Sequence, residues 1–132
     1  MGEKVIAGDM KELDGKLRLD LLPARVLQKV CGAFAYGGLY YDYWNWRLGT
    51  TGLARYYGAA LRHMLRWYEC QGQGAHMDHD PDSEIHHIDA AIASLMILRD
   101  LQLGAPNVTD DRPAFMVDRL KLKRESQEET PE

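Results

Sequence analysis

Metal-ligating side chains are concentrated in residues 76–89, whose sequence is HMDHDPDSEIHHID. These fourteen residues hold four of the chain's five histidines and five carboxylates. Carboxylate oxygens and imidazole nitrogens are common protein ligands of divalent cations, and several in a short span can converge on one ion. The stretch therefore predicts a divalent-metal site. The alternative is a solvated acidic loop that caps a helix.

Helical phase singles out Asp89 within this stretch. Asp80-Pro81 is a good N-cap and first-turn pair. The apolar positions that follow recur every three or four residues: Ile85, Ile88, Ile92 and Leu95. At about 100° per residue Asp89 falls near this apolar stripe, where an unpaired carboxylate is costly to bury. We expect Asp89 to bind metal or act in catalysis; an ion pair with an arginine of the preceding helix is the alternative.

Other residues of the stretch are weaker ligand candidates. Asp82 lies near Asp89 in helical phase, while Glu84 and His87 are close enough along a helix to share an ion or to form an ordinary exposed pair. Residues 76–80 are expected to serve mainly as a connection and helix cap. Whether Asp78 and Asp80 are also ligands stays open.

Positive charge is grouped on the preceding segment, residues 50–70, which has the apolar periodicity of a helix. Arg62 and Arg66 lie opposite its apolar stripe, His63 lies at the edge, and Glu69 follows Arg66. Guanidinium groups bind phosphate through paired hydrogen bonds, so this face would suit a metal-bound polyphosphate. The alternative is a solvated polar face, which we favour for Arg55.

An aromatic segment, residues 36–46, connects this helix to an earlier one. Tyr36, Tyr40 and Trp46 can stack on a purine, and the Asn45 amide can both donate to and accept from a base or sugar. Aromatic residues that cover the core or an oligomer interface are the alternative. Further upstream, Lys16 and Arg18 either reach phosphate or are exposed.

Three helices are predicted, over residues 23–36, 50–70 and 81–103, with no strands worth assigning. Gly37-Gly38 is expected to end the first, and Gly104-Ala105-Pro106 the third. We assign residues 1–118 to one all-α domain. Residues 119–132 lose aromatic residues and gain charge, which predicts a frayed helix and then a disordered tail.

Composition excludes several classes of protein. A net charge of −4 gives no basic excess for genomic nucleic acid. The chain has no apolar run of about 18 residues and no signal-peptide core, so we expect a cytoplasmic protein without a membrane span. Cys31 and Cys70 are far apart, which favours reduced thiols. A zinc site of Cys70, His76 and His79 is a minor alternative.

Several short motifs occur in order along residues 16 to about 98: KLRLDLLP at 16–23, YGGLY at 36–40, NW at 45–46, RHMLRW at 62–67, DHDPDS at 78–83 and HID at 87–89. Together they resemble the phage dATP/dGTP diphosphohydrolase family, a divergent branch of the MazG-like nucleoside triphosphate pyrophosphatases. The resemblance implies an all-α, MazG-like helical bundle completed by homo-oligomerisation as a dimer or tetramer. It also implies two or more Mg²⁺ or Mn²⁺ ions and hydrolysis of a deoxynucleoside triphosphate to monophosphate and pyrophosphate.

Within this family the chain resembles the members from cyanophages that make diaminopurine DNA. For these the substrate would be dGTP or GTP, and the product would feed diaminopurine deoxynucleotide synthesis in the cytoplasm of the bacterial host. MazG-like enzymes ordinarily carry E-x-x-E on one helix and E-x-x-D on the next. The corresponding positions here read Arg66-x-x-Glu69 and His86-x-x-Asp89, so two expected carboxylates are missing.

The resemblance and the residue patterns together assign roles. We expect Glu69, Glu84 and Asp89 to be catalytic metal ligands, with Asp82 and His87 as further ligands. Contacts to substrate are expected from ten residues: Lys16, Arg18, Asp20, Tyr36, Tyr40, Asn45, Trp46, Arg62, His63 and Arg66. Two other classes stay as alternatives. One is a non-enzymatic helical oligomerisation module with a structural cation, and the other, suggested by His79-Asp80, is an HD-type phosphohydrolase.

Overall fold

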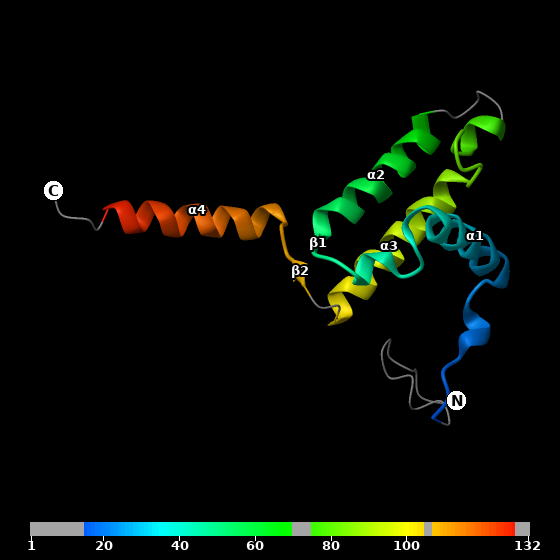
Figure 1. Cartoon of the computed structure of the whole chain (residues 1–132), viewed down its shortest axis with the longest axis horizontal. Coiled ribbons are helices and arrows are strands. Elements are labelled where there is room, and N and C mark those ends of the chain that lie inside the picture. Colours follow the sequence, from blue (N-terminus) through cyan, green and yellow to red (C-terminus); the bar gives the residue numbers. More distant parts are fainter. Residues whose placement is uncertain (1–14, 70–74, 105–106, 129–132) are drawn as a thin grey trace, which may run out of the picture.

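The computed structural model describes residues 15–69, 75–104 and 107–128, and most of these residues are helical (Figure 1). The α-helices of this described part are α1 (Ala24–Tyr41), α2 (Leu53–Glu69), α3 (His87–Gly104) and α4 (Pro113–Glu128). Single 3₁₀ turns lie at Leu19–Leu21, Asn45–Arg47 and Ala75–Asp78. The mainly helical prediction is confirmed. The structure adds a pair of two-residue parallel strands, β1 (Thr51–Gly52) and β2 (Val108–Thr109), which the sequence pattern did not predict.

Helix α1 runs further than predicted, because Gly37-Gly38 does not end it. The helix continues to Tyr41 and stops at Asp42, whose φ of 71° is left-handed. Gly38 allows close packing instead: the ring of Tyr43 occupies the space that a Cβ atom at residue 38 would need. Most of the aromatic segment therefore belongs to α1 and the turn after it.

Helix α3 begins at His87, six residues later than the predicted start, because Asp80 caps a turn instead of the helix. Its Oδ1 accepts hydrogen bonds from the backbone N–H groups of Asp82 (2.9 Å) and Ser83 (3.2 Å). Glu84 then adopts a φ of 62°, which a continuing helix does not allow. An antiparallel bridge between His79 and His86 closes the loop. Asp82 and Glu84 thus lie in a loop, and the helical-phase argument does not apply to them.

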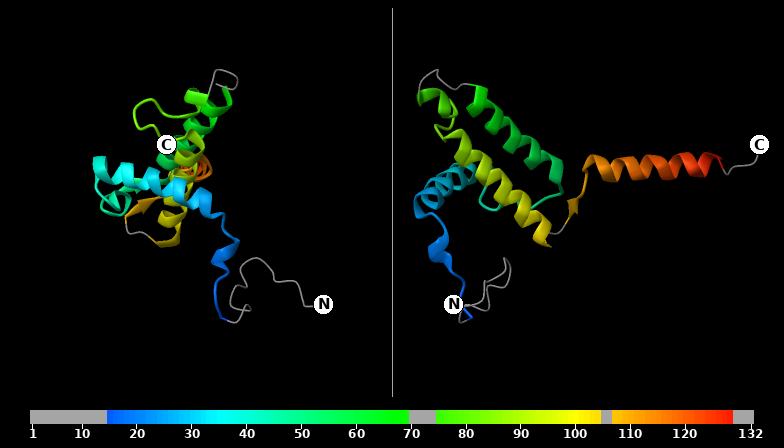
Figure 2. Two further views of the ribbon diagram at one scale, coloured as in Figure 1. Left: turned by 90° about the vertical axis from the view of Figure 1, so that its right-hand side faces the viewer. Right: turned by 180° about the vertical axis from the view of Figure 1, so that it is seen from behind.

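Helices α2 and α3 form an antiparallel pair, and α1 crosses α3 (Figures 1 and 2). Small residues are buried on both helices, Ala60 on α2 and Ala91 and Ala93 on α3. Since Ala91 and Ala93 lie about 200° apart around α3, only one of the two can face α2. A core cluster forms around Trp46, Leu53 and Leu101, where α2 begins and α3 ends. Its half-buried partners are Phe34, Tyr56, Ile97, Leu98 and Val108.

A charged network ties the turn after α1 to α3. Asp100 accepts hydrogen bonds from the indole N–H of Trp46 (2.8 Å) and from Nε and Nη2 of Arg47 (2.7 and 2.6 Å). The Arg47 guanidinium also lies 4.5 Å from the centre of the Trp44 ring. The bonds from Arg47 and then Trp46 lower the pKa of Asp100 to about 2. Asp100 therefore holds the 3₁₀ turn Asn45–Arg47 against the core.

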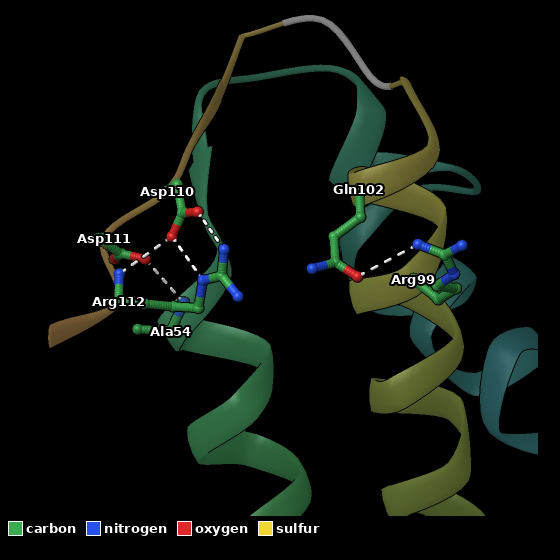
Figure 3. Close-up of polar contacts among 6 residues, drawn as sticks. All are labelled: Ala54, Arg99, Gln102, Asp110, Asp111 and Arg112. Carbon is green, nitrogen blue, oxygen red and sulfur yellow. Dashed lines mark hydrogen bonds and ion pairs between the residues drawn. The ribbon is translucent and has the colours of Figure 1, made fainter. Parts of the chain in front are cut away.

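The parallel strand pair places Asp111 at the start of α2 (Figure 3). Its Oδ1 accepts a hydrogen bond of 2.8 Å from the backbone N–H of Ala54, which satisfies one of the free donors of the first turn. The same carboxylate lies in the space that a Cβ atom at residue 52 would occupy, so a larger residue there would displace it from the N–H of Ala54. Asp111 is therefore a structural residue.

Helix α4 extends away from the other helices (Figures 1 and 2). Residues 119–128 belong to this helix, whereas the sequence predicts a frayed helix and a disordered tail from residue 119. The boundary at residue 118 stays a prediction, and residues 129–132 lie outside the described residues. None of the helices in the described part is long and apolar enough to cross a membrane.

We predict that Asp100→Asn lowers the free energy of unfolding by about 1–2 kcal/mol at neutral pH, because the bonds from Arg47 lose their charge. The pKa of Asp100 is depressed in the folded state. Its contribution is therefore present above pH 3.8 and is lost as the pH falls toward about 2. Urea denaturation at several pH values measures this difference.

The matched control is Asp20→Asn, which breaks an exposed pair with Arg18 two residues away. Such exposed pairs contribute little, so Asp20→Asn is expected to leave the free energy of unfolding nearly unchanged. Equal losses in the two variants would contradict the role given to Asp100.

Candidate active site

Three metal-ligating side chains from different elements meet beside the α2–α3 pair, and we call them the His63–Asp80–His87 triad. His63 comes from α2, Asp80 from the loop before α3, and His87 is the first residue of α3. One ligand atom of each residue lies within 4.8 Å of the other two. The two imidazole Nδ1 atoms are 3.0 Å apart, and His87 is only 2% exposed.

The surroundings favour the metal-binding forms of all three side chains. Burial is the largest cause of the lowered pKa of His87 and of His63, and it outweighs the opposing effect of Asp80. Burial also acts to raise the pKa of Asp80. The N–H groups of Asp82 and Ser83, together with the two histidines, overcome it, so the pKa of Asp80 is lowered. The triad thus offers two neutral imidazoles and one carboxylate near neutral pH.

Cationic side chains of α2 lie near the triad. The charges of Arg62 and Arg66 help to lower the pKa of His63, and Arg66 does the same for His87. Both arginines are exposed and make no ion pair among the described residues. They are therefore placed to meet an anion that reaches the triad.

Tyrosines of α1 face the same loop. A hydrogen bond with Tyr40 is the largest cause that raises the pKa of Tyr36 to about 12, and the charges of Asp82 and Asp80 add to it. The two tyrosine rings have centroids 4.7 Å apart. The structure thus brings Tyr36, a predicted substrate contact, near the loop that supplies Asp80, and the ring of Tyr40, another predicted contact, lies beside it.

An open depression of about 800 Å³ lies beside this loop, between α1 and the start of α3. Glu84 and Asp89, two of the predicted metal ligands, line it together with Lys29, Trp67 and His86. Asp89 is half-buried and forms no ion pair among the described residues, so the predicted alternative of an arginine partner is not seen.

The remaining predicted metal ligands are more scattered. Glu69 is the exposed last residue of α2, and Asp82 is exposed in the loop. Within residues 15–69, 75–104 and 107–128, neither these two nor Glu84 and Asp89 belong to a close group of three ligands. Of the predicted ligands only His87 does. Cys70 lies outside the described residues, and so does the side chain of His76.

Several predicted substrate contacts have other partners. Arg18 and Asp20 form an ion pair with each other (2.8 Å), and Lys16 is exposed. Trp46 is 9% exposed and its indole donates to Asp100, so its position is structural. Asn45 is half-buried in the neighbouring turn, and its role as a base contact stays a prediction.

The sequence interpretation missed the partnership within the triad. It assigned His63 to substrate and left Asp80 open as a cap, because the two residues belong to different segments. A usable signal was present. His63 stands three residues after Ala60 on the apolar side of α2, where an imidazole needs a polar partner.

A comparison with known families identifies the domain. Residues 7–112 match the model of the dATP/dGTP diphosphohydrolase N-terminal domain. The chain belongs to the dATP/dGTP diphosphohydrolase family. This membership confirms the predicted resemblance to that family and the prediction that the chain is an enzyme. The matched residues include the whole triad but not α4. No curated protein and no solved structure matches the chain.

The lowered pKa values of His63 and His87 predict that the metal-free protein loses stability in mild acid. Below pH 6.5 the unfolded chain binds protons that the folded imidazoles do not, so the free energy of unfolding falls as the pH falls. Denaturant titrations of chelator-treated protein between about pH 7.5 and about pH 5 measure this slope. We expect a smaller slope in His63→Gln.

Ser83→Ala is the matched control, since it removes one loop hydrogen bond, to the N–H of Ile85, without changing a titratable group. It should retain the slope of the parent protein. A parent protein whose stability is constant over this pH range would contradict the account of the two imidazoles.

Proposed function

We propose that the chain hydrolyses the α–β phosphoanhydride of a purine deoxynucleoside triphosphate, with dGTP or GTP as substrate, to the monophosphate and pyrophosphate. Family membership supports the reaction class. The observation that carries the location of the site is the triad of neutral imidazoles and carboxylate beside Arg62 and Arg66. A triphosphate needs such a combination of metal ligands and cationic side chains.

Divalent ions, Mg²⁺ or Mn²⁺ in two or more sites, would supply charge neutralisation and an activated water. The chain's own residues would position the substrate and stabilise its charge. Phosphoryl transfer depends mainly on positioning and electrostatics, and Arg62 and Arg66 can each donate paired hydrogen bonds to phosphate oxygens. His63, Asp80 and His87 would hold one ion. Glu84 and Asp89 line the depression between α1 and α3 and are the candidates for a second.

The nucleoside would lie toward α1. Tyr36 lies near the loop that carries Asp80, with the Tyr40 ring beside it. Trp67 lines the depression, and its side chain is 41% exposed. Each of these rings offers a flat face for a purine. Asn45 stays a candidate for the sugar or base.

The proposal also includes the oligomeric state of the enzyme and the use of its product. The exposed apolar side chains of α2 make one stripe at intervals of three or four residues: Tyr57, Leu61, Met64, Leu65 and Tyr68. Such a stripe favours a homodimer or homotetramer. The product dGMP would feed diaminopurine deoxynucleotide synthesis in a phage-infected bacterial cytoplasm.

The two alternatives predict different behaviour. In an HD-type phosphohydrolase His79 and Asp80 would act together. Here Asp80 lies with His63 and His87, and the backbone of His79 forms an antiparallel β-bridge with that of His86. A structural-cation module would gain thermal stability from metal alone. The proposed enzyme gains further stability from nucleotide, and only when metal is present.

Product analysis tests the reaction directly. Purified protein is incubated with each dNTP or GTP and Mg²⁺ or Mn²⁺, and products are resolved by ion exchange. We expect a nucleoside monophosphate and pyrophosphate in equal amounts, with dGTP the best substrate among the dNTPs. A nucleoside diphosphate, free triphosphate or no product would sink the proposal.

Substitution of single carboxylates separates the metal ligands. We expect Asp80→Asn and Asp89→Asn each to lower kcat by about 100-fold, the usual cost of losing one group that stabilises transition-state charge. Glu69→Gln, at the exposed end of α2, tests the ligand that the family resemblance implies. Circular dichroism checks that each variant is folded.

Asp42→Asn is the matched control and should keep full activity, because residue 42 is exposed at the end of α1 and the substitution removes a charge with almost no change of shape. Full activity in Asp80→Asn would remove the triad from the mechanism. Full activity in Asp89→Asn would remove only the second set of ligands.

A further inference from the structure

We propose that the His63–Asp80–His87 triad is a site for a first-row transition-metal ion such as Co²⁺ or Zn²⁺, and that it selects these ions over Mg²⁺. The inference deepens the proposed function and rests on it for the ion's part in hydrolysis. Its metal preference is a separate property that binding alone reveals.

The geometry of the imidazoles fits one ion. Two nitrogen ligands about 2.1 Å from an ion lie about 3.0 Å apart in octahedral geometry and about 3.4 Å apart in tetrahedral geometry. The Nδ1 atoms of His63 and His87 are 3.0 Å apart and share a hydrogen bond, in which one Nδ1 donates and the other accepts. An ion that replaces the shared proton would therefore need the two rings to move apart by about 0.4 Å at most.

The third ligand needs only a small adjustment. The ligand atoms of the triad lie within 4.8 Å of one another, and opposite ligands of one ion span about 4.2 Å. Both loop hydrogen bonds to the Asp80 carboxylate use Oδ1, which leaves Oδ2 for an ion. The capping bonds also fix the side chain on the loop, so the carboxylate is held in place before an ion arrives.

The kinds of ligand decide the selectivity. Mg²⁺ takes oxygen ligands in a nearly ideal octahedron, whereas imidazole favours the later first-row ions. Two nitrogens and one carboxylate oxygen form a set that leaves positions open for water or phosphate oxygens. Burial of His87 at 2% exposure fixes one of the two imidazoles firmly.

Direct binding measures the preference. Chelator-treated full-length protein is titrated with Co²⁺, Zn²⁺, Mn²⁺ or Mg²⁺ in a calorimeter, without nucleotide, and the visible spectrum of the Co²⁺ form is recorded. We expect one tight site per chain for Co²⁺ and Zn²⁺, with Kd at least about 100-fold below that of Mg²⁺. The Co²⁺ spectrum should lack thiolate charge-transfer bands, which would mark cysteine ligands.

Two variants connect this binding to the triad. Asp80→Asn keeps an oxygen that can cap the loop but removes the carboxylate, and His63→Gln removes one imidazole from the half-buried face of α2. Each should weaken Co²⁺ binding at least about 10-fold. Asp42→Asn and His79→Gln, the matched controls, should bind as the parent protein does.

The outcomes separate this inference from the proposed reaction. Equal affinity for Mg²⁺ and Co²⁺, parent-like binding in Asp80→Asn, or loss of binding in His79→Gln would overturn the site. Tight Co²⁺ binding that depends on the triad, in a protein that releases no pyrophosphate from any dNTP, would uphold the site and defeat the proposed function. Nucleotide hydrolysis by a protein that does not bind Co²⁺ through the triad would uphold the proposed reaction and overturn the metal site.

Discussion

The close approach of α2 and α3 is the constraint on which the rest of the structure depends. Ala60 and Ala91 allow it, because larger side chains at these buried positions would push the helices apart. His63 lies three residues after Ala60, and His87 lies four residues before Ala91. In an antiparallel pair these offsets place both imidazoles toward the same end, where α2 nears its C-terminus and α3 begins, and their Nδ1 atoms are 3.0 Å apart. The pairing of α2 with α3 thus brings the two imidazoles together.

The loop before α3 turns this pair into a site with a defined charge. Asp80 performs two tasks, since its backbone and Oδ1 shape the turn while its charge lies beside two imidazoles. The bonds that shape the turn also keep the carboxylate ionised. Asp80 therefore serves both the shape of the loop and the charge of the candidate site.

The sequence predicted the three main helices and the division of charge between α2 and the loop, because apolar periodicity and composition are local properties. It placed the start of α3 wrongly, since Asp80-Pro81 caps a turn as readily as a helix and the left-handed conformation of Glu84 depends on the folded loop. The triad could not be predicted from local sequence patterns. Its members come from positions 63, 80 and 87, and only the pairing of α2 with α3 shows that His63 and His87 meet. Trp46 became a core residue for the same reason: its partner, Asp100, lies in another helix.

The central claim is that a catalytic ion lies between α2 and the loop before α3 in this dATP/dGTP diphosphohydrolase domain. Anomalous diffraction from crystals grown with Mn²⁺ and a non-hydrolysable dGTP analogue tests it most directly. The account predicts an anomalous peak bonded to His63, Asp80 and His87, with phosphate oxygens of the analogue completing the shell. A nucleotide-bound ion held only by Glu69, Glu84 or Asp89, with the two imidazoles still in direct contact, would contradict it.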